Sequence, residues 1–147
     1  MAQINIDDLP VKEMIDKAMS MLTRSYTPYS HWKVGATLLG ASGKIWGGCN
    51  IENAAYTPTN CAERTAFFKA ISEGESDFKA IAVVGGNEGK VESYCFPCGV
   101  CRQVMMEFCN PETFIVIAAK SREEYLVQTL SQILPNGFGP ASLKEHL

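Results

Sequence analysis

The placement of the cysteines is the feature that most constrains how this chain folds. The stretch CFPCGVC sets Cys95, Cys98 and Cys101 at even spacing around one proline. Pro97 lacks an N–H and has a φ suited to the start of a helix, so Cys98 and Cys101 are expected in a first helical turn, on one face. Cys61 stands at the start of a second predicted helix, in the triplet CAE. Adjacent strands leading into these helices would bring the three thiols together at one sheet edge.

The rest of the chain alternates between helical and strand-like patterns. Apolar residues at helical spacing predict helices in residues 11–26, 61–74 and 97–109. Strands are predicted at 32–39 and 44–51, as a hairpin, at 78–86 and 113–120 as buried runs, and at 125–128, followed by a helical turn. This order predicts an α/β sandwich with a mixed sheet, parallel where helices cross over.

Length and composition limit the class of protein. The 147 residues, 46% of them hydrophobic, fit one domain spanning residues 1–147. Lys and Arg number 13 against 16 Asp and Glu, without a basic run, so no nucleic-acid partner is expected. No segment has the apolar core of a signal peptide or the roughly 20 apolar residues of a membrane span. We therefore expect a cytoplasmic protein without a membrane partner.

Six cysteines in a reducing compartment favour metal ligation or burial over disulfides, the weaker alternative. Cys61, Cys98 and Cys101 with a free fourth position describe a catalytic zinc site, because structural zinc sites have four protein ligands. A structural site closed by Cys95 or His31 is the alternative. An iron–sulfur cluster on CFPCGVC is disfavoured, because the ferredoxin run places its last cysteine four residues on, directly before a proline.

Four motifs carry a resemblance to a known family. CAE followed by PCGVC is the three-cysteine form of the zinc nucleobase-deaminase signature. CNIENAAY, CAERTA, PCGVCRQV and ILPNGFGP occur in the order in which similar motifs occur in small-subunit cytidine deaminases. The resemblance runs from about Tyr29 to Leu143. It implies a three-layer αβα sandwich with a mixed five-stranded sheet, one zinc ion per chain, a homotetramer, and hydrolytic deamination of cytidine and deoxycytidine.

Two charged residues follow Cys61 and are assigned roles on the metal side. Glu63 is expected to carry protons without ligating the metal, as the signature requires of its glutamate. The alternative is a capping box between Asn60 and Glu63. Three thiolates on Zn²⁺ leave a net charge of −1, and Arg64, by hydrogen bonds to the sulfurs, would offset it. The alternative for Arg64 is a solvated position on the helix.

The resemblance also implies the substrate contacts. Asn50 and Glu52 match the pair that holds the sugar 3′-hydroxyl, and the amide of Ala62 matches the contact to the base O2. Trp32 stands where the family usually has a phenylalanine beside the base, and Phe138 matches a ring that reaches over the base in a neighbouring subunit. From the residues alone, NIEN is a turn, Trp32 a core aromatic and Phe138 a ring covering its own core. Cysteine rather than histidine at position 61 favours a free nucleoside as substrate.

Overall fold

The computed structural model describes residues 4–144, which contain a mixed five-stranded sheet in the order β2-β1-β3-β4-β5. The strands are β1 (Trp32–Gly40), β2 (Ile45–Cys49), β3 (Phe78–Asn87), β4 (Ile115–Ala119) and β5 (Tyr125–Thr129). Only β3 and β4 pair in parallel, and they are the two strands joined by the crossover helix α3 (Gly99–Phe108). The other pairs are antiparallel, including the expected β1–β2 hairpin.

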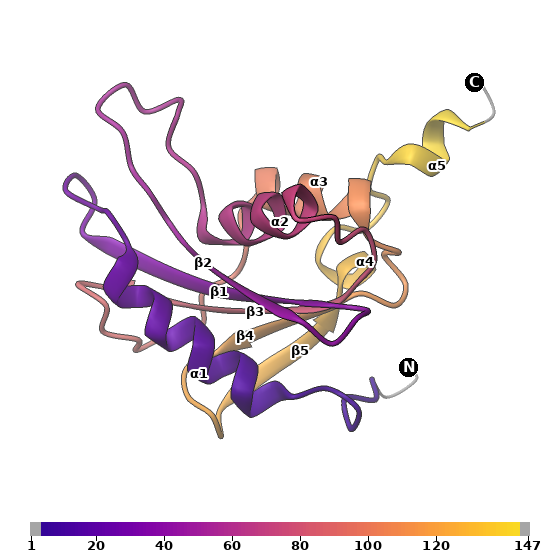
Figure 1. Ribbon diagram of the computed structural model, residues 1–147, viewed down its shortest axis with the longest axis horizontal. Helices are drawn as coiled ribbons and strands as arrows, with labels where there is room; N and C mark the ends of the chain where they lie inside the picture. The colour runs from indigo at the N-terminus through magenta and orange to yellow at the C-terminus, as the bar shows by residue number, and fades with distance from the viewer. Residues whose placement is uncertain (1–3, 145–147) are drawn as a thin grey trace.

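Helices cover both faces of the sheet and make three layers (Figure 1). The helices besides α3 are α1 (Val11–Met21), continued by a 3₁₀ turn at Leu22–Arg24, α2 (Ala62–Ser72), α4 (Leu130–Ile133) and α5 (Pro140–Leu143). Helix α1 lies on one face, and α2 and α3 lie on the other. No helix within residues 4–144 is long and apolar enough to cross a membrane. The predicted αβα sandwich is thus confirmed, whereas α5 was not predicted.

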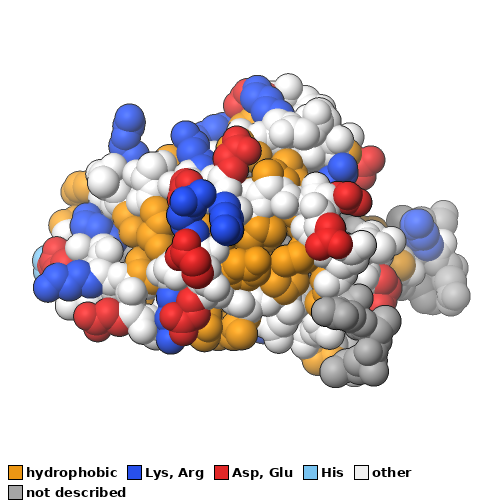
Figure 2. Space-filling model, turned by 90° about the horizontal axis from the view of Figure 1, so that it is seen from below, with side chains coloured by type: hydrophobic (Ala, Val, Ile, Leu, Met, Phe, Trp, Pro, Cys, Tyr) orange, Lys and Arg blue, Asp and Glu red, His pale blue; other side chains and the backbone are white. Residues whose placement is uncertain are grey.

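The alternation of β3 divides the core between the two faces. Ile81 and Val83 pack with α2 and α3, while Ala80, Ala82 and Val84 pack with α1. The small side chains on the second face leave room for α1 to approach the sheet closely. On that side of the molecule, hydrophobic side chains gather in patches separated by a column of charged ones (Figure 2).

The sheet brings the first turns of α2 and α3 to one edge, although not by the predicted route. Helix α2 follows β2 and α3 follows β3, and these strands are separated by β1 rather than adjacent. Both run antiparallel to β1, so their carboxyl ends still point the same way. Helix α2 also lies so close to β2 that a Cβ added at Gly48 would stand 2.2 Å from the carbonyl oxygen of Ala62.

Candidate active site

The two helix starts bring three thiols together. Cys61 is the N-cap of α2, Cys98 is the N-cap of α3, and Cys101 lies in the first turn of α3. Their Sγ atoms all lie within 4.8 Å of one another, and those of Cys61 and Cys98 are 3.7 Å apart. Cys98 was expected inside the helical turn, but its backbone is extended, with ψ of 168°. The two N-cap positions direct the sulfurs of separate helices at each other.

The donor set fits zinc. Tetrahedral ligands at the usual Zn–S distance of about 2.3 Å are about 3.8 Å apart, close to the observed Cys61–Cys98 separation. Cys61 and Cys98 both stand at helix starts, where the positive end of the helix dipole favours a bound cation's anionic ligand set. Across the described residues, no fourth Cys, His, Asp or Glu joins the group. His31 instead lies 3.3 Å from the Glu88 carboxylate, which argues against the closed structural site.

Arg64 contacts the thiols rather than solvent. Its Nη2 donates a hydrogen bond to the Cys61 sulfur at 3.2 Å. A hydrogen bond from Cys101, and then those from Arg64 and Cys98, lower the pKa of the Cys61 thiol against the opposing effect of burial. The solvated alternative for Arg64 was therefore wrong. A guanidinium held here offsets part of the negative charge that three thiolates bring to one place.

Glu63 is the only buried charged side chain within residues 4–144, with 4% of its surface exposed. Burial raises the pKa of its carboxyl to about 7, and the charge of Cys61 adds to the rise. The capping-box alternative was wrong, because Cys61 rather than Asn60 is the N-cap. Asn60 instead donates from Nδ2 to the hydroxyl of Thr65 at 3.1 Å. A buried carboxyl that changes charge near neutral pH is suited to moving protons.

A cavity of about 220 Å³ opens onto Cys61, Glu63 and Cys98, whereas Cys101 and Arg64 do not line it. Its lining consists of Trp32, Val34, Asn50, Thr59, Asn60, Cys61, Ala62, Glu63, Cys95, Phe96 and Cys98. Trp32 is 41% exposed, so its interpretation as a core aromatic was wrong. Cys95 and Phe96 were not predicted in the site; the only signal was their position just before the PCGVC motif. Five sequence-predicted residues besides Trp32 share this cavity: Asn50, Cys61, Ala62, Glu63 and Cys98.

Asn50 and Glu52 both bind backbone near Trp32. Asn50 accepts from the Val34 N–H at 2.9 Å and donates from Nδ2 to the Trp32 carbonyl at 2.7 Å. Glu52 accepts from the N–H of Ser30 at 3.1 Å and from its hydroxyl, which lowers the pKa of the Glu52 carboxyl. Glu52 lines a neighbouring cavity of about 450 Å³. Asn50 thus braces the wall of the site, whereas Glu52 lies outside the lining that contains Glu63; each side chain still has hydrogen-bonding capacity.

Two of the predicted substrate contacts would not come from a side chain that lines the cavity: Ala62 and Phe138. Ala62 is the first residue of α2 and is fully buried, so its contribution to a ligand is its backbone N–H, which has no intrahelical acceptor. Phe138 is 58% exposed and does not line the cavity of its own chain. Its interpretation as a ring covering its own core was wrong.

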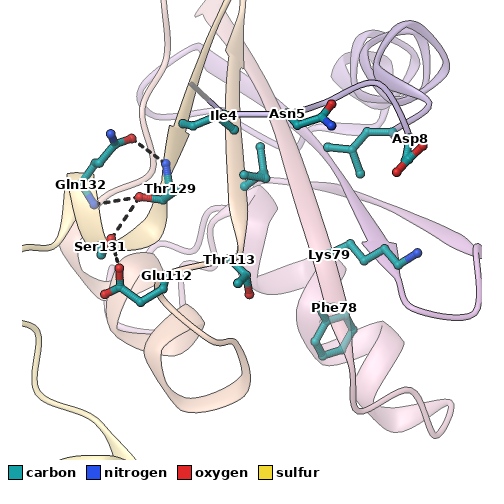
Figure 3. A pocket seen from close by; sticks show the side chains of 12 residues that line it. Ile4, Asn5, Asp8, Phe78, Lys79, Glu112, Thr113, Thr129, Ser131 and Gln132 are labelled. Carbon is teal, nitrogen blue, oxygen red and sulfur yellow. Dashed lines mark hydrogen bonds between the residues drawn. The ribbon is translucent and has the colours of Figure 1, made fainter. Parts of the chain in front are cut away.

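A larger cavity, about 710 Å³, lies elsewhere (Figure 3). It is lined by the segment around Ile4 to Leu9, the beginnings of β3 and β4, and the capped start of α4. None of the predicted site residues lines it. Volume alone is therefore a poor guide to the chemistry of this molecule, because thiols and the buried carboxyl gather at the smaller cavity.

Three clustered thiols and a buried carboxyl at the first turns of two helices, on a mixed αβα sheet, define the class of zinc-dependent hydrolytic deaminases. The family model for the cytidine and deoxycytidylate deaminase zinc-binding region matches residues 10–118. The chain belongs to this cytidine and deoxycytidylate deaminase family.

Relatives in sequence and structure agree with this assignment. A cytidine deaminase of Sporosarcina psychrophila is 45% identical over 135 residues, 92% of this chain and 96% of that protein. One of Halalkalibacterium halodurans is also 45% identical, over 125 residues, 85% of this chain and 91% of that protein. The crystal structure of cytidine deaminase from Burkholderia pseudomallei superposes with a TM-score of 0.77 at 41% identity, covering 86% of this chain and 97% of that one.

Proposed function

We propose that this protein hydrolyses cytidine and deoxycytidine to uridine and deoxyuridine, releasing ammonia. One observation carries the proposal: the sulfurs of Cys61, Cys98 and Cys101 converge within 4.8 Å, next to the only buried charged residue of the described chain, Glu63. A zinc ion held by these three thiolates would supply a Lewis acid that favours ionisation of water near neutral pH. Three protein ligands leave a position for the reacting molecule.

Glu63 performs the proton transfers in this proposal. Hydrolysis at C4 of cytosine requires a proton to leave water, a proton to reach ring N3, and a proton to reach the departing amino nitrogen. A carboxyl with a pKa of about 7 takes up and releases protons with nearly equal ease at neutral pH. Its burial keeps bulk water from competing for these protons. Arg64 remains paired with the Cys61 sulfur and limits the negative charge near the departing group.

The cavity wall positions the nucleoside. The Ala62 N–H points its partial positive charge, at a helix start, towards the proposed place of the base O2. Asn50 and Glu52 retain capacity for the sugar 3′-hydroxyl, and Trp32 stands beside the base. We include a homotetramer in the proposal, because Phe138 is 58% exposed and lies outside its own cavity, where a neighbouring subunit could receive its ring.

The experiment is a comparison of substrates by the loss of ultraviolet absorbance. Cytidine and deoxycytidine should be deaminated, with release of ammonia, and adenosine should not be. Cytidine 5′-monophosphate should be a poor substrate, because the described cavity lining contains no Lys or Arg to pair with a phosphate. Equal efficiency on nucleoside and nucleotide would contradict the proposed substrate class, and an unchanged cytidine spectrum would contradict the function.

A further inference from the structure

Trp32 lines two cavities. The first is the cavity of about 220 Å³ that is lined by Glu63, Cys61 and Cys98. The second, about 270 Å³, is lined by Trp32 with Asn87, Lys90, Glu92 and Ser93. Trp32 is the only residue the two linings share. It therefore forms the partition between the reaction site and a separate polar space.

The backbone of Trp32 is held on both sides. Its N–H donates to the Ser30 hydroxyl at 3.0 Å, and its carbonyl accepts from Asn50 at 2.7 Å. Trp32 also pairs with Asn87 across the β1–β3 ladder. Just beyond the pair, His31 and Glu88 have φ of 60° and 55°, and the Glu88 N–H donates to the His31 carbonyl at 2.7 Å. Because the backbone of Trp32 is held in this way, only its indole ring could move to connect the two cavities.

Cys95 lines the same cavity as Trp32 on the side of the reaction site. Burial raises the pKa of the Cys95 thiol to about 11, against the opposing effect of a side-chain hydrogen bond with Trp32. The thiol thus stays neutral and behaves as a small packing group. Its sulfur lies directly over Gly85 of β3, where an added Cβ would stand 2.8 Å away. The sheet at Gly85 thus blocks Cys95 from moving away from the cavity that it lines with Trp32, and this holds the thiol beside the indole.

We propose that Trp32, positioned by Cys95, sets the upper size of the pyrimidine that the site accepts by closing it off from the second cavity. The excluded substrates are cytidines with a bulky group on the ring. Of the two ring carbons that bear neither the sugar nor the leaving group, C5 is next to the reacting C4 and can carry groups of graded size, so it is the position that the test varies. This inference rests on the proposed deaminase function.

The test compares kcat/KM for cytidine, 5-methylcytidine and 5-propynylcytidine in the wild-type enzyme, Trp32→Phe and Trp32→Ala. We expect the ratio of the propynyl substrate to cytidine to rise at least about tenfold in Trp32→Phe, and further in Trp32→Ala. Comparing ratios between variants cancels the electronic effect of the substituent. An unchanged ratio in variants that still deaminate cytidine would overturn the proposal.

Cys95→Ala tests the positioning role. The same ratio should rise, and the fluorescence of Trp32 should shift to longer wavelength as the indole gains water; Trp32→Phe identifies its share of the emission of the two tryptophans. Cys95→Ser should keep the wild-type spectrum. Cys109→Ala is the matched control, because Cys109 is another half-buried thiol that lies outside the cavity. A shift in the control equal to that in Cys95→Ala would overturn the positioning role.

Binding measurements distinguish a failure of this inference from a failure of the proposed function. Calorimetric dissociation constants for uridine and 5-propynyluridine give a size preference without turnover. If wild-type enzyme leaves cytidine unchanged, the deaminase proposal fails, and the binding ratio in the Trp32 variants still decides the size limit. If the affinity for 5-propynyluridine relative to uridine rises in these variants, the size limit is supported. If the relative affinity does not rise, or if neither compound binds, the size limit is overturned.

Discussion

At the residue scale, the burial of the Glu63 carboxyl lowers the stability of the fold but suits the proposed proton transfers. A carboxyl with 4% of its surface exposed carries a desolvation cost that a purely structural residue would avoid. Neighbouring groups do not compensate for this desolvation cost: the pKa of the Glu63 carboxyl is raised, which means that the charged form is disfavoured. This uncompensated burial is what makes Glu63 a candidate for the proposed proton transfers. From the sequence, catalysis is favoured over a capping box for Glu63, and the structure excludes the box because Cys61 rather than Asn60 is the N-cap.

Glu63→Gln should keep the zinc and the fold but lose turnover by at least about 10²- to 10⁴-fold. The amide replaces the carboxyl at nearly equal volume and cannot carry the proton. Zinc content and steady-state rate should be measured on the same preparation. Glu73→Gln is the control, because Glu73 ends the same helix on the surface. Near-normal turnover by Glu63→Gln would exclude it as the proton carrier.

Arg64→Gln should weaken zinc binding by about 10- to 100-fold while leaving the three cysteines in place. The loss arises because the hydrogen bond to the Cys61 sulfur stabilises its thiolate form. Competition with a chromogenic chelator measures the affinity. Arg122→Gln is the matched control, since Arg122 pairs with Asp16 on the surface. Equal affinities for the two variants would show that Arg64 does not act on the metal site.

At the element scale, the site depends on how closely α2 approaches β2. Gly48 permits that approach, because any side chain there would meet the backbone of α2. This close approach of α2 to Gly48 holds Cys61 and Glu63 at the cavity. A change in the spacing between α2 and β2 would therefore displace the start of the helix. Gly99, at the start of α3, has open space around it and offers a comparison within the same site.

Gly48→Ala should lower the free energy of unfolding by about 3 kcal/mol or more, because the new Cβ would lie 2.2 Å from a backbone atom. Gly99→Ala should leave stability unchanged or raise it by up to about 1 kcal/mol. Urea denaturation of the zinc-loaded proteins measures both. A Gly48→Ala variant as stable as the wild type would mean that α2 does not lie against β2 as described.

Most elements could be predicted from periodicity, and the errors have physical causes. The hairpin, the buried strands and the helices of residues 61–74 and 97–109 follow from local apolar spacing, which is a property of each segment. The position of β1 between β2 and β3 is a choice of long-range pairing that no local pattern specifies. Helix α5 is a single turn after Pro140, too short to show a period. Cys95 lines the cavity because the segment after β3 folds back beside Gly85 of that strand, and apolar spacing does not show this.

At the scale of the whole molecule, one chain brings the three thiols and Glu63 together but does not place Phe138 at its own cavity. The ring is 58% exposed, and the Phe138 carbonyl accepts from Gln103 at 2.8 Å, which anchors the segment to α3. The resemblance of ILPNGFGP implies a role between subunits. The sequence of a single chain could indicate this role only through that resemblance, because an intersubunit contact leaves no local pattern.

Coexpression of Glu63→Ala with Phe138→Ala chains tests the shared site. A Phe138→Ala subunit keeps its zinc and Glu63, and it would borrow a ring from its Glu63→Ala neighbour. Mixed oligomers isolated by two tags should therefore exceed the activity expected from their Phe138→Ala chains alone. If they do not, Phe138 acts within its own chain or only packs. The molecular mass in solution, expected to be that of four chains, provides the accompanying control.

The most direct test of the deaminase centre is ammonia release from cytidine measured against zinc content in one titrated series. Protein is stripped with a chelator, checked for its fold by circular dichroism, and reloaded in steps up to one zinc per chain. We predict equal amounts of uridine and ammonia, with a rate that rises in proportion to bound zinc from a baseline near zero. Fully loaded, folded protein that leaves cytidine intact, or a rate that does not change with zinc content, would contradict the account.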